Sequence, residues 1–158
     1  MYNLHQPSFG LANCCDLFEK LKYEFQKLTP ENTDPYTLFN YLTTSNHLNE
    51  WIKGDCGIDQ GIKDEAEEYR KNSNEHRIIN SLCNSAKHFK LKNKDKEVDK
   101  KVLPGLDFNH LDFNNLNFGG TVYYVTVDRE DINIYDICKM NFEFWNTFFQ
   151  NHKITFRG

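Results

Sequence analysis

Apolar residues recur at helical spacing in four segments of the chain. In residues 12–28, apolar side chains three to four positions apart line one helical face: Cys14, Phe18, Leu21, Phe25 and Leu28. The same spacing recurs in residues 35–53 with Leu38, Tyr41, Leu42, Leu48 and Ile52. It recurs in residues 75–91 with Ile78, Ile79, Leu82, Ala86 and Phe89. The last such segment is 130–150, with Ile134, Ile137, Cys138, Phe144, Trp145, Phe148 and Phe149. The pattern predicts four helices that bury one face each.

The residues between these segments predict the helix ends and the rest of the fold. Asp34 suits the N-cap of the second helix and Pro35 its first position. Residues 53–61, KGDCGIDQG, are turn-rich and end that helix. Residues 62–72 are acidic and predict either a short exposed helix or a loop. The β-branched and aromatic residues of 121–128, TVYYVTVD, predict a strand.

We therefore expect a mainly α fold. It is a bundle of four or five helices in one domain over residues 1–158, with a loop and β insertion over 91–128 before the last helix. Within the insertion, residues 106–118 (LDFNHLDFNNLNF) repeat every five positions and resemble pentapeptide repeats. Three pentads are too few for one full superhelical turn, so we expect an ordered loop or small hairpin over the helices.

Composition narrows the class of protein. The chain has 158 residues, of which 39% are hydrophobic, and five cysteines without a C-x-x-C pair. This spacing favours neither a disulfide framework nor a zinc site, and no cofactor is predicted. Cys14, Cys83 and Cys138 fall on predicted core faces as small apolar residues. Free cysteines, no apolar run of membrane length and no signal peptide predict a cytoplasmic protein.

Charge is unevenly distributed along the chain. The net charge of −4 argues against nucleic-acid binding over the whole surface, but not through a local patch. Residues 55–68 hold six carboxylates against Lys63, and residues 87–101 hold seven lysines against three acidic residues. The acidic stretch suits a basic partner. The lysine-rich stretch is either a solvated loop or a phosphate-binding patch.

Two polar stripes run along predicted helices. Arg77, Ser81, Asn84 and His88 lie opposite the apolar face of the third helix, and Asn40, Thr44, His47 and Trp51 lie away from that of the second. If the two helices are neighbours, the stripes line one groove with imidazoles, amides and an indole that stacks on a base.

Arg77 and His88 are about 16 Å apart along the helix axis, so only a symmetric dimer brings them to one atom. A structural interpretation competes with this site. Any surface helix has a polar stripe, and Lys87 and His88 also complement a helix C-terminus, where Asn84 and His88 serve as caps or bond to the insertion.

Three stretches carry a resemblance to a known family. DPYTLFNYLTTSNHLNEWI (34–52), IINSLCNSAKHFK (78–90) and FEFWNTFF (142–149) resemble small bacterial and phage proteins with an Asn-x-x-Lys-His-Phe ending on one helix. That family is in turn similar to the HEPN superfamily of helical bundles, many of which are RNA-cleaving toxins or phage-defence effectors. The resemblance implies a HEPN-like bundle, a homodimer, and RNA as a partner.

The resemblance also implies roles for individual residues. His88 would assist the 2′-hydroxyl of RNA in attacking the adjacent phosphate without a metal, with Asn84 and Lys87 beside it. His47, Trp51, Asn40, Thr44 and Arg77 would bind the RNA. The chain departs from the HEPN pattern because Cys83 stands where an arginine is expected, and Lys87 lacks the bidentate fork of that arginine.

A second match to the HEPN spacing runs from Arg70 to His76, in a polar segment expected to be irregular. Because the catalytic set is incomplete, two functions stay open. One is an RNA-directed HEPN-like protein, active or degenerate. The other is a non-enzymatic module, from a phage or mobile element, that docks on a host or defence protein.

Overall fold

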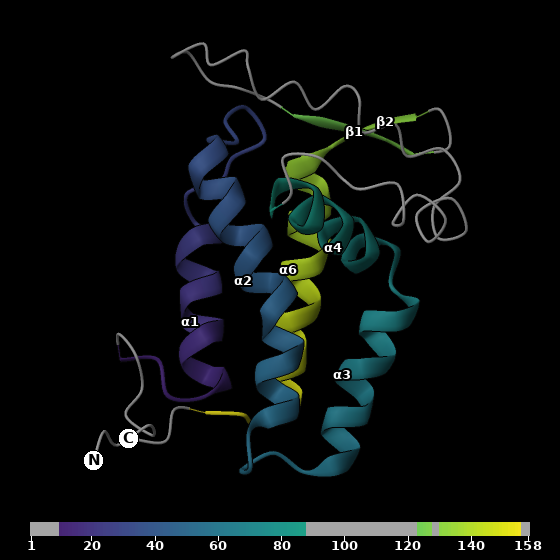
Figure 1. Cartoon of the computed structure of the whole chain (residues 1–158). Helices are drawn as coiled ribbons and strands as arrows, with labels where there is room; N and C mark the ends of the chain where they lie inside the picture. Colours follow the sequence, from purple (N-terminus) through teal and green to yellow (C-terminus); the bar gives the residue numbers. More distant parts are fainter. Residues whose placement is uncertain (1–9, 88–122, 128–129, 156–158) are drawn as a thin grey trace.

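A computed structural model describes residues 10–87, 123–127 and 130–155. Its elements are helices α1 (Cys14–Phe25), α2 (Pro35–Gly54), α3 (Gln60–Asn72), α4 (Asn74–Lys87) and α6 (Ile134–Asn151), and strands β1 (Tyr124–Val127) and β2 (Glu130–Asn133). The fold is mainly helical, with a small two-stranded sheet before the last helix, as the sequence predicts (Figure 1).

Helix α2 makes the most extensive contacts with other helices in the described part of the chain. In Figure 1, α1, α2 and α6 run side by side, α3 flanks them, and α4 crosses α2 and α6 near the sheet. Helix α2 lies against α1, α3 and α4, and α6 lies against α1 and α4. None of the described helices combines the length and apolar content needed to cross a bilayer.

Capping side chains fix where the helices begin. Asn13 Oδ1 accepts from the Asp16 amide at 3.1 Å, and the Asp16 carboxylate accepts from the Asn13 amide at 3.1 Å, which is a capping box. Asp34 accepts from the Thr37 amide at 2.8 Å, with Pro35 at the first helical position. The predicted start of the second helix is therefore confirmed.

The core is built from the predicted apolar faces and is rich in aromatic rings. The Phe18 and Phe149 rings stack with centroids 4.1 Å apart, which joins α1 to α6. Cys14, Cys83 and Cys138 are buried, as predicted. Of the predicted core residues of the third helix, Ile78, Ile79 and Leu82 are buried.

Several predicted boundaries were wrong. Helix α1 ends at Phe25, and Leu28 is buried from the turn that follows. Residues 130–133 do not start the last helix, because they pair antiparallel with β1 in the register Tyr124↔Asn133. Asn133 then caps α6 by accepting from the Tyr135 amide at 2.9 Å. Of the two alternatives for residues 62–72, the helix is correct. The 106–118 repeat lies outside the described residues.

Candidate functional site

The predicted site depends on α2 and α4 being neighbours, and they are. Cys83 Sγ lies 3.9 Å from Thr43 Oγ1, within reach of the weak hydrogen bond a thiol makes. This contact places the C-terminal half of α4 on the middle of α2. The exposed side chain of Asn84 follows directly, at the edge of the crossing.

Five residues of α2 lie on the side of the helix that carries the Thr43–Cys83 contact. Tyr36 is 74% exposed and Phe39 is 42% exposed, and they share a stripe of about 100° with Asn40, Thr43 and His47. We call these five residues the α2 face. Asn40 is exposed, and the half-buried His47 ring places Nδ1 3.9 Å from a Glu50 carboxylate oxygen.

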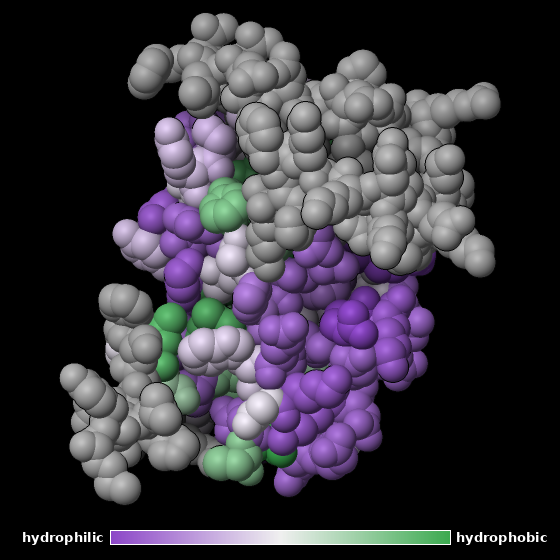
Figure 2. All heavy atoms as spheres, viewed as in Figure 1, coloured by the Kyte–Doolittle hydropathy of each residue, from purple (hydrophilic) through white to green (hydrophobic). Residues whose placement is uncertain are grey.

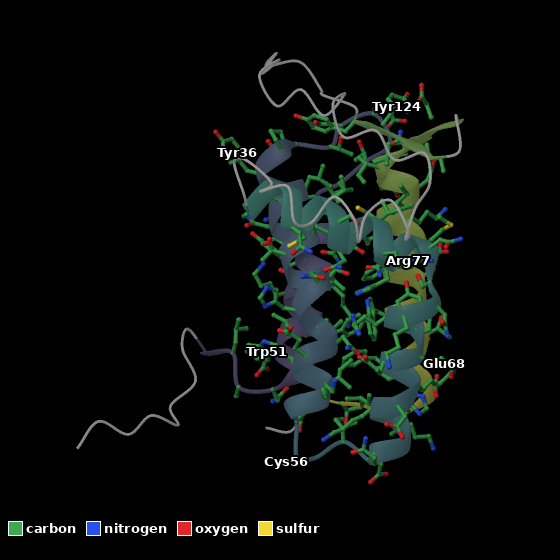
Figure 3. All side chains as sticks on the ribbon, turned by 45° about the vertical axis from the view of Figure 1, so that its right-hand side comes forward. Tyr36, Trp51, Cys56, Glu68, Arg77 and Tyr124 are labelled. Carbon is green, nitrogen blue, oxygen red and sulfur yellow. The ribbon has the colours of Figure 1, made fainter. Side chains whose placement is uncertain are left out.

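The predicted α2 stripe is only partly correct. Thr44 is buried, and its hydroxyl accepts a 2.7 Å hydrogen bond from Lys20 Nζ, so it faces α1. It does not lie on the outward stripe, because at about 100° per residue it turns toward the α1 flank. Trp51 is half-buried against the core and lies on the side of α2 away from α3 (Figure 3).

The predicted α4 stripe is spread along the helix. Asn84 Nδ2 donates to Asn80 Oδ1 at 3.4 Å, within its own helix. Arg77 is half-buried and seven residues earlier, about 10 Å along the axis, near the start of α4 (Figure 3). Lys87 ends α4, and His88 lies outside the described residues. Asn40, His47 and Asn84 thus lie within about one helical turn of the Thr43–Cys83 contact, and Thr44, Trp51 and Arg77 do not face it.

The position at which the HEPN pattern expects an arginine points inward. Cys83 is 1% exposed and packs in the core. A guanidinium there would be buried among apolar side chains and would not reach a substrate. The crossing therefore has exposed amides and an imidazole, but no cation from this position.

Arg70 and His76, the second match to the HEPN spacing, are not placed to act on a substrate. Arg70, in the last turn of α3, binds Glu67 through two hydrogen bonds of 2.7 and 2.9 Å. His76 is 1% exposed in the first turns of α4. Burial, and then the charge of Arg70, lower the pKa of His76 to about 4. A neutral, enclosed imidazole of this kind does not contact a substrate.

Sequence reasoning missed a buried polar network that joins three helices. Asn141 of α6 is fully buried, and its Oδ1 accepts from Ser45 Oγ at 2.6 Å. Its Nδ2 donates to the Tyr69 hydroxyl at 3.0 Å. The Tyr41 hydroxyl lies 2.8 Å from the Cys138 carbonyl oxygen. A lone Asn at the helical spacing of Ile137 and Trp145 was the signal in the sequence.

Two further features lie away from the α2–α4 crossing. A hollow of about 260 Å³ lies between the start of α1, the α2–α3 turn and the turn after α6, where Cys15 Sγ donates to the Thr155 carbonyl at 3.3 Å. Burial raises the pKa of the neighbouring Cys14 thiol, so a reactive thiolate is disfavoured. No group of three or more His, Cys, Asp or Glu side chains in the described part of the chain is placed to hold a metal.

The arrangement is thus an exposed surface of aromatic and polar side chains, without an assembled catalytic set among the residues that the structure describes. Comparison of the chain with protein-family models, with curated proteins and with solved structures finds no significant match.

Proposed function

We propose that this protein is a non-enzymatic interaction module that binds another protein through the α2 face. The observation that carries the proposal is the exposure of two large rings, Tyr36 and Phe39, beside Asn40 and His47. Exposed aromatic anchors with polar side chains around them are typical of protein-binding surfaces, where a few such rings supply most of the affinity.

The charge of the molecule favours a basic partner. Helix α3 exposes Asp64, Glu65 and Glu68, and Asp59 before it is exposed as well. Figure 2 shows hydrophilic side chains covering the side on which α3 lies. On α2, Glu50 is exposed next to His47. A basic protein would be attracted to both carboxylate-bearing regions, and the attraction weakens with salt.

The test compares protein capture by the intact chain and by two surface variants. The double variant Tyr36→Ala/Phe39→Ala removes the exposed rings of the α2 face. Tyr23→Ala removes a tyrosine of similar exposure, 59%, from α1. We expect a partner captured from host lysate by the wild type to be lost with the double variant and kept with Tyr23→Ala. Equal capture by all three would contradict the proposal.

RNA binding is the second candidate, and the crossing of α2 and α4 favours it. Asn84, Asn40 and His47 offer amides and an imidazole to unpaired bases, and Tyr36 and Phe39 offer stacking surfaces. Seven lysines follow in residues 87–101. This is the HEPN-like function, linked to phage defence or toxin action, in which a symmetric dimer would bring Arg77 of one copy to His88 of the other.

The two candidates are separated by incubating the purified protein with total RNA at low salt in EDTA. The interaction module neither binds nor cleaves RNA, and its captured partner survives ribonuclease treatment. RNA binding that is lost in Asn40→Ala would favour the second candidate instead. Metal-independent cleavage that disappears in His88→Ala would show an active enzyme and overturn the non-enzymatic proposal.

A further inference from the structure

Helix α3 contributes little to the core. Of its 13 residues only Ala66 is buried, while Ile62 and Tyr69 are half-buried on the same side. Helices in proteins are stabilised mainly by burying an apolar face. Helix α3 is therefore less firmly held by packing than its neighbours, for example α2, which buries eight side chains.

Three side chains tie α3 to the rest of the molecule. Glu67 Oε2 accepts from Asn49 Nδ2 of α2 at 2.9 Å, and Glu65 Oε2 lies 2.9 Å from Nε2 of His152 at the end of α6. Tyr69 stacks on Phe144 with ring centroids 3.4 Å apart, and its hydroxyl accepts a 3.0 Å hydrogen bond from the buried Asn141 of α6. The two carboxylate contacts are partly exposed, and water can replace them when they break, whereas opening α3 also breaks the buried Tyr69–Asn141 bond.

Both ends of α3 are joined by short non-helical links. Ser73 alone separates α3 from α4, with extended backbone angles of φ −76° and ψ 128°. Residues 55–59 separate α3 from α2. Changes in the backbone angles of a few such residues are enough to turn a whole helix.

The residues beneath α3 include two buried nitrogen atoms without a hydrogen-bond partner. Nδ1 of His76 and Nε1 of Trp145 are such atoms among the described residues. The Tyr69 ring lies edge-on to both rings, at centroid distances of 5.7 Å from His76 and 5.3 Å from Trp145. Water that entered on opening would satisfy these atoms, which lowers the free energy needed to move α3.

We propose that α3 is an opening arm, which swings as a unit about Ser73 and uncovers the aromatic surface of α6 formed by Phe144 and Trp145. The surrounding bundle of α1, α2 and α6 stays folded when the arm opens. This device is independent of the α2 face, so it does not rest on the function proposed above.

Amide hydrogen exchange on the full chain tests the arm directly. The wild type is followed at several low denaturant concentrations, with the Trp145 indole N–H observed alongside the backbone amides. We expect the α3 amides and the Trp145 indole proton to exchange together, faster than the amides of α1 and α2 and with a weaker dependence on denaturant. Exchange of α3 in step with α1 and α2 would overturn the proposal, since only global unfolding would then release it.

The substitution Asn49→Asp should make α3 open more often, and it keeps nearly the same side-chain volume. Asn49→Asp places a carboxylate against Glu67 and should raise the exchange of α3 about tenfold, the factor for losing a buried hydrogen bond, with α1 unchanged. Asn46→Asp makes the same change one turn earlier on α2 and should leave α3 as in the wild type. Equal effects of the two variants would count against the arm, and if Asn49→Asp does not fold, the wild-type exchange pattern decides.

Discussion

Asn141 donates its side-chain amide to the Tyr69 hydroxyl at 3.0 Å, although the two residues lie 72 positions apart in the chain. The same amide accepts from Ser45 at 2.6 Å, so one buried side chain connects α6 to α2 and α3. In a dry interior such bonds specify a single arrangement of helices, because any other packing leaves the amide unpaired.

The central place of Asn141 predicts a large loss of stability on its removal. In Asn141→Ala, the Ser45 hydroxyl loses its acceptor, the Tyr69 hydroxyl loses the Asn141 donor and a cavity forms, so we expect a cost of about 2–4 kcal/mol in the free energy of unfolding. Urea denaturation measures it. Asn146→Ala, at a half-buried position of the same helix, should cost well under half as much. Similar losses in both variants would show that the network does not hold the helices together.

The start of α2 offers a test with an internal control. Asp34 accepts a capping hydrogen bond from the Thr37 amide at 2.8 Å. Asp59 occupies the same position before α3, but its side chain accepts no capping bond from the described residues. Asp34→Ala should therefore lower the free energy of unfolding by about 1 kcal/mol, and Asp59→Ala by only a few tenths. Thermal unfolding of the two variants compares them, and a reversed order would contradict the assignment of the cap.

The helical fold could be predicted from the sequence because it follows from local rules. The spacing of Leu38, Leu48 and Ile52 and the Asp34–Pro35 pair specify α2 without reference to the rest of the chain. The prediction failed at residues 130–133, because pairing with β1 overrides a pattern that resembles a helix.

The candidate site was harder to predict, since it depends on which neighbour each face meets. Thr44 lies just beyond the edge of the outward stripe on a helical wheel, and the position of α1 buries it against Lys20. His76 sits in a polar stretch of the sequence, yet the bend at Ser73 turns it inward against Tyr69 and Trp145. The burial of these two side chains depends on which helix packs against them, so the local sequence does not show it.

Placing an arginine at the position that the HEPN pattern expects should not create an enzyme. Cys83 is 1% exposed against Thr43, so Cys83→Arg forces an unpaired cation into the core at a cost of about 3–5 kcal/mol. Asn84→Arg, at the exposed neighbouring position, should change the stability by less than about 0.5 kcal/mol. Urea denaturation separates the two. A stable Cys83→Arg variant that cleaves RNA would revive the catalytic interpretation.

The buried imidazole of His76 predicts a stability that depends on pH. Its pKa falls from 6.5 to about 4 on folding, chiefly through burial, so between these values the unfolded chain binds the proton more tightly. The free energy of unfolding is therefore unaffected by the titration of His76 above pH 6.5. It decreases as the pH falls toward 4, by up to about 3 kcal/mol. Urea denaturation between pH 4 and pH 7 measures this loss, and His76→Leu, which fills the site without titrating, should remove that part of the slope while the carboxylate contributions remain. An unchanged slope in His76→Leu would mean that the imidazole is already solvated in the folded chain, which would also weaken the case for an arm that must open to let water reach it.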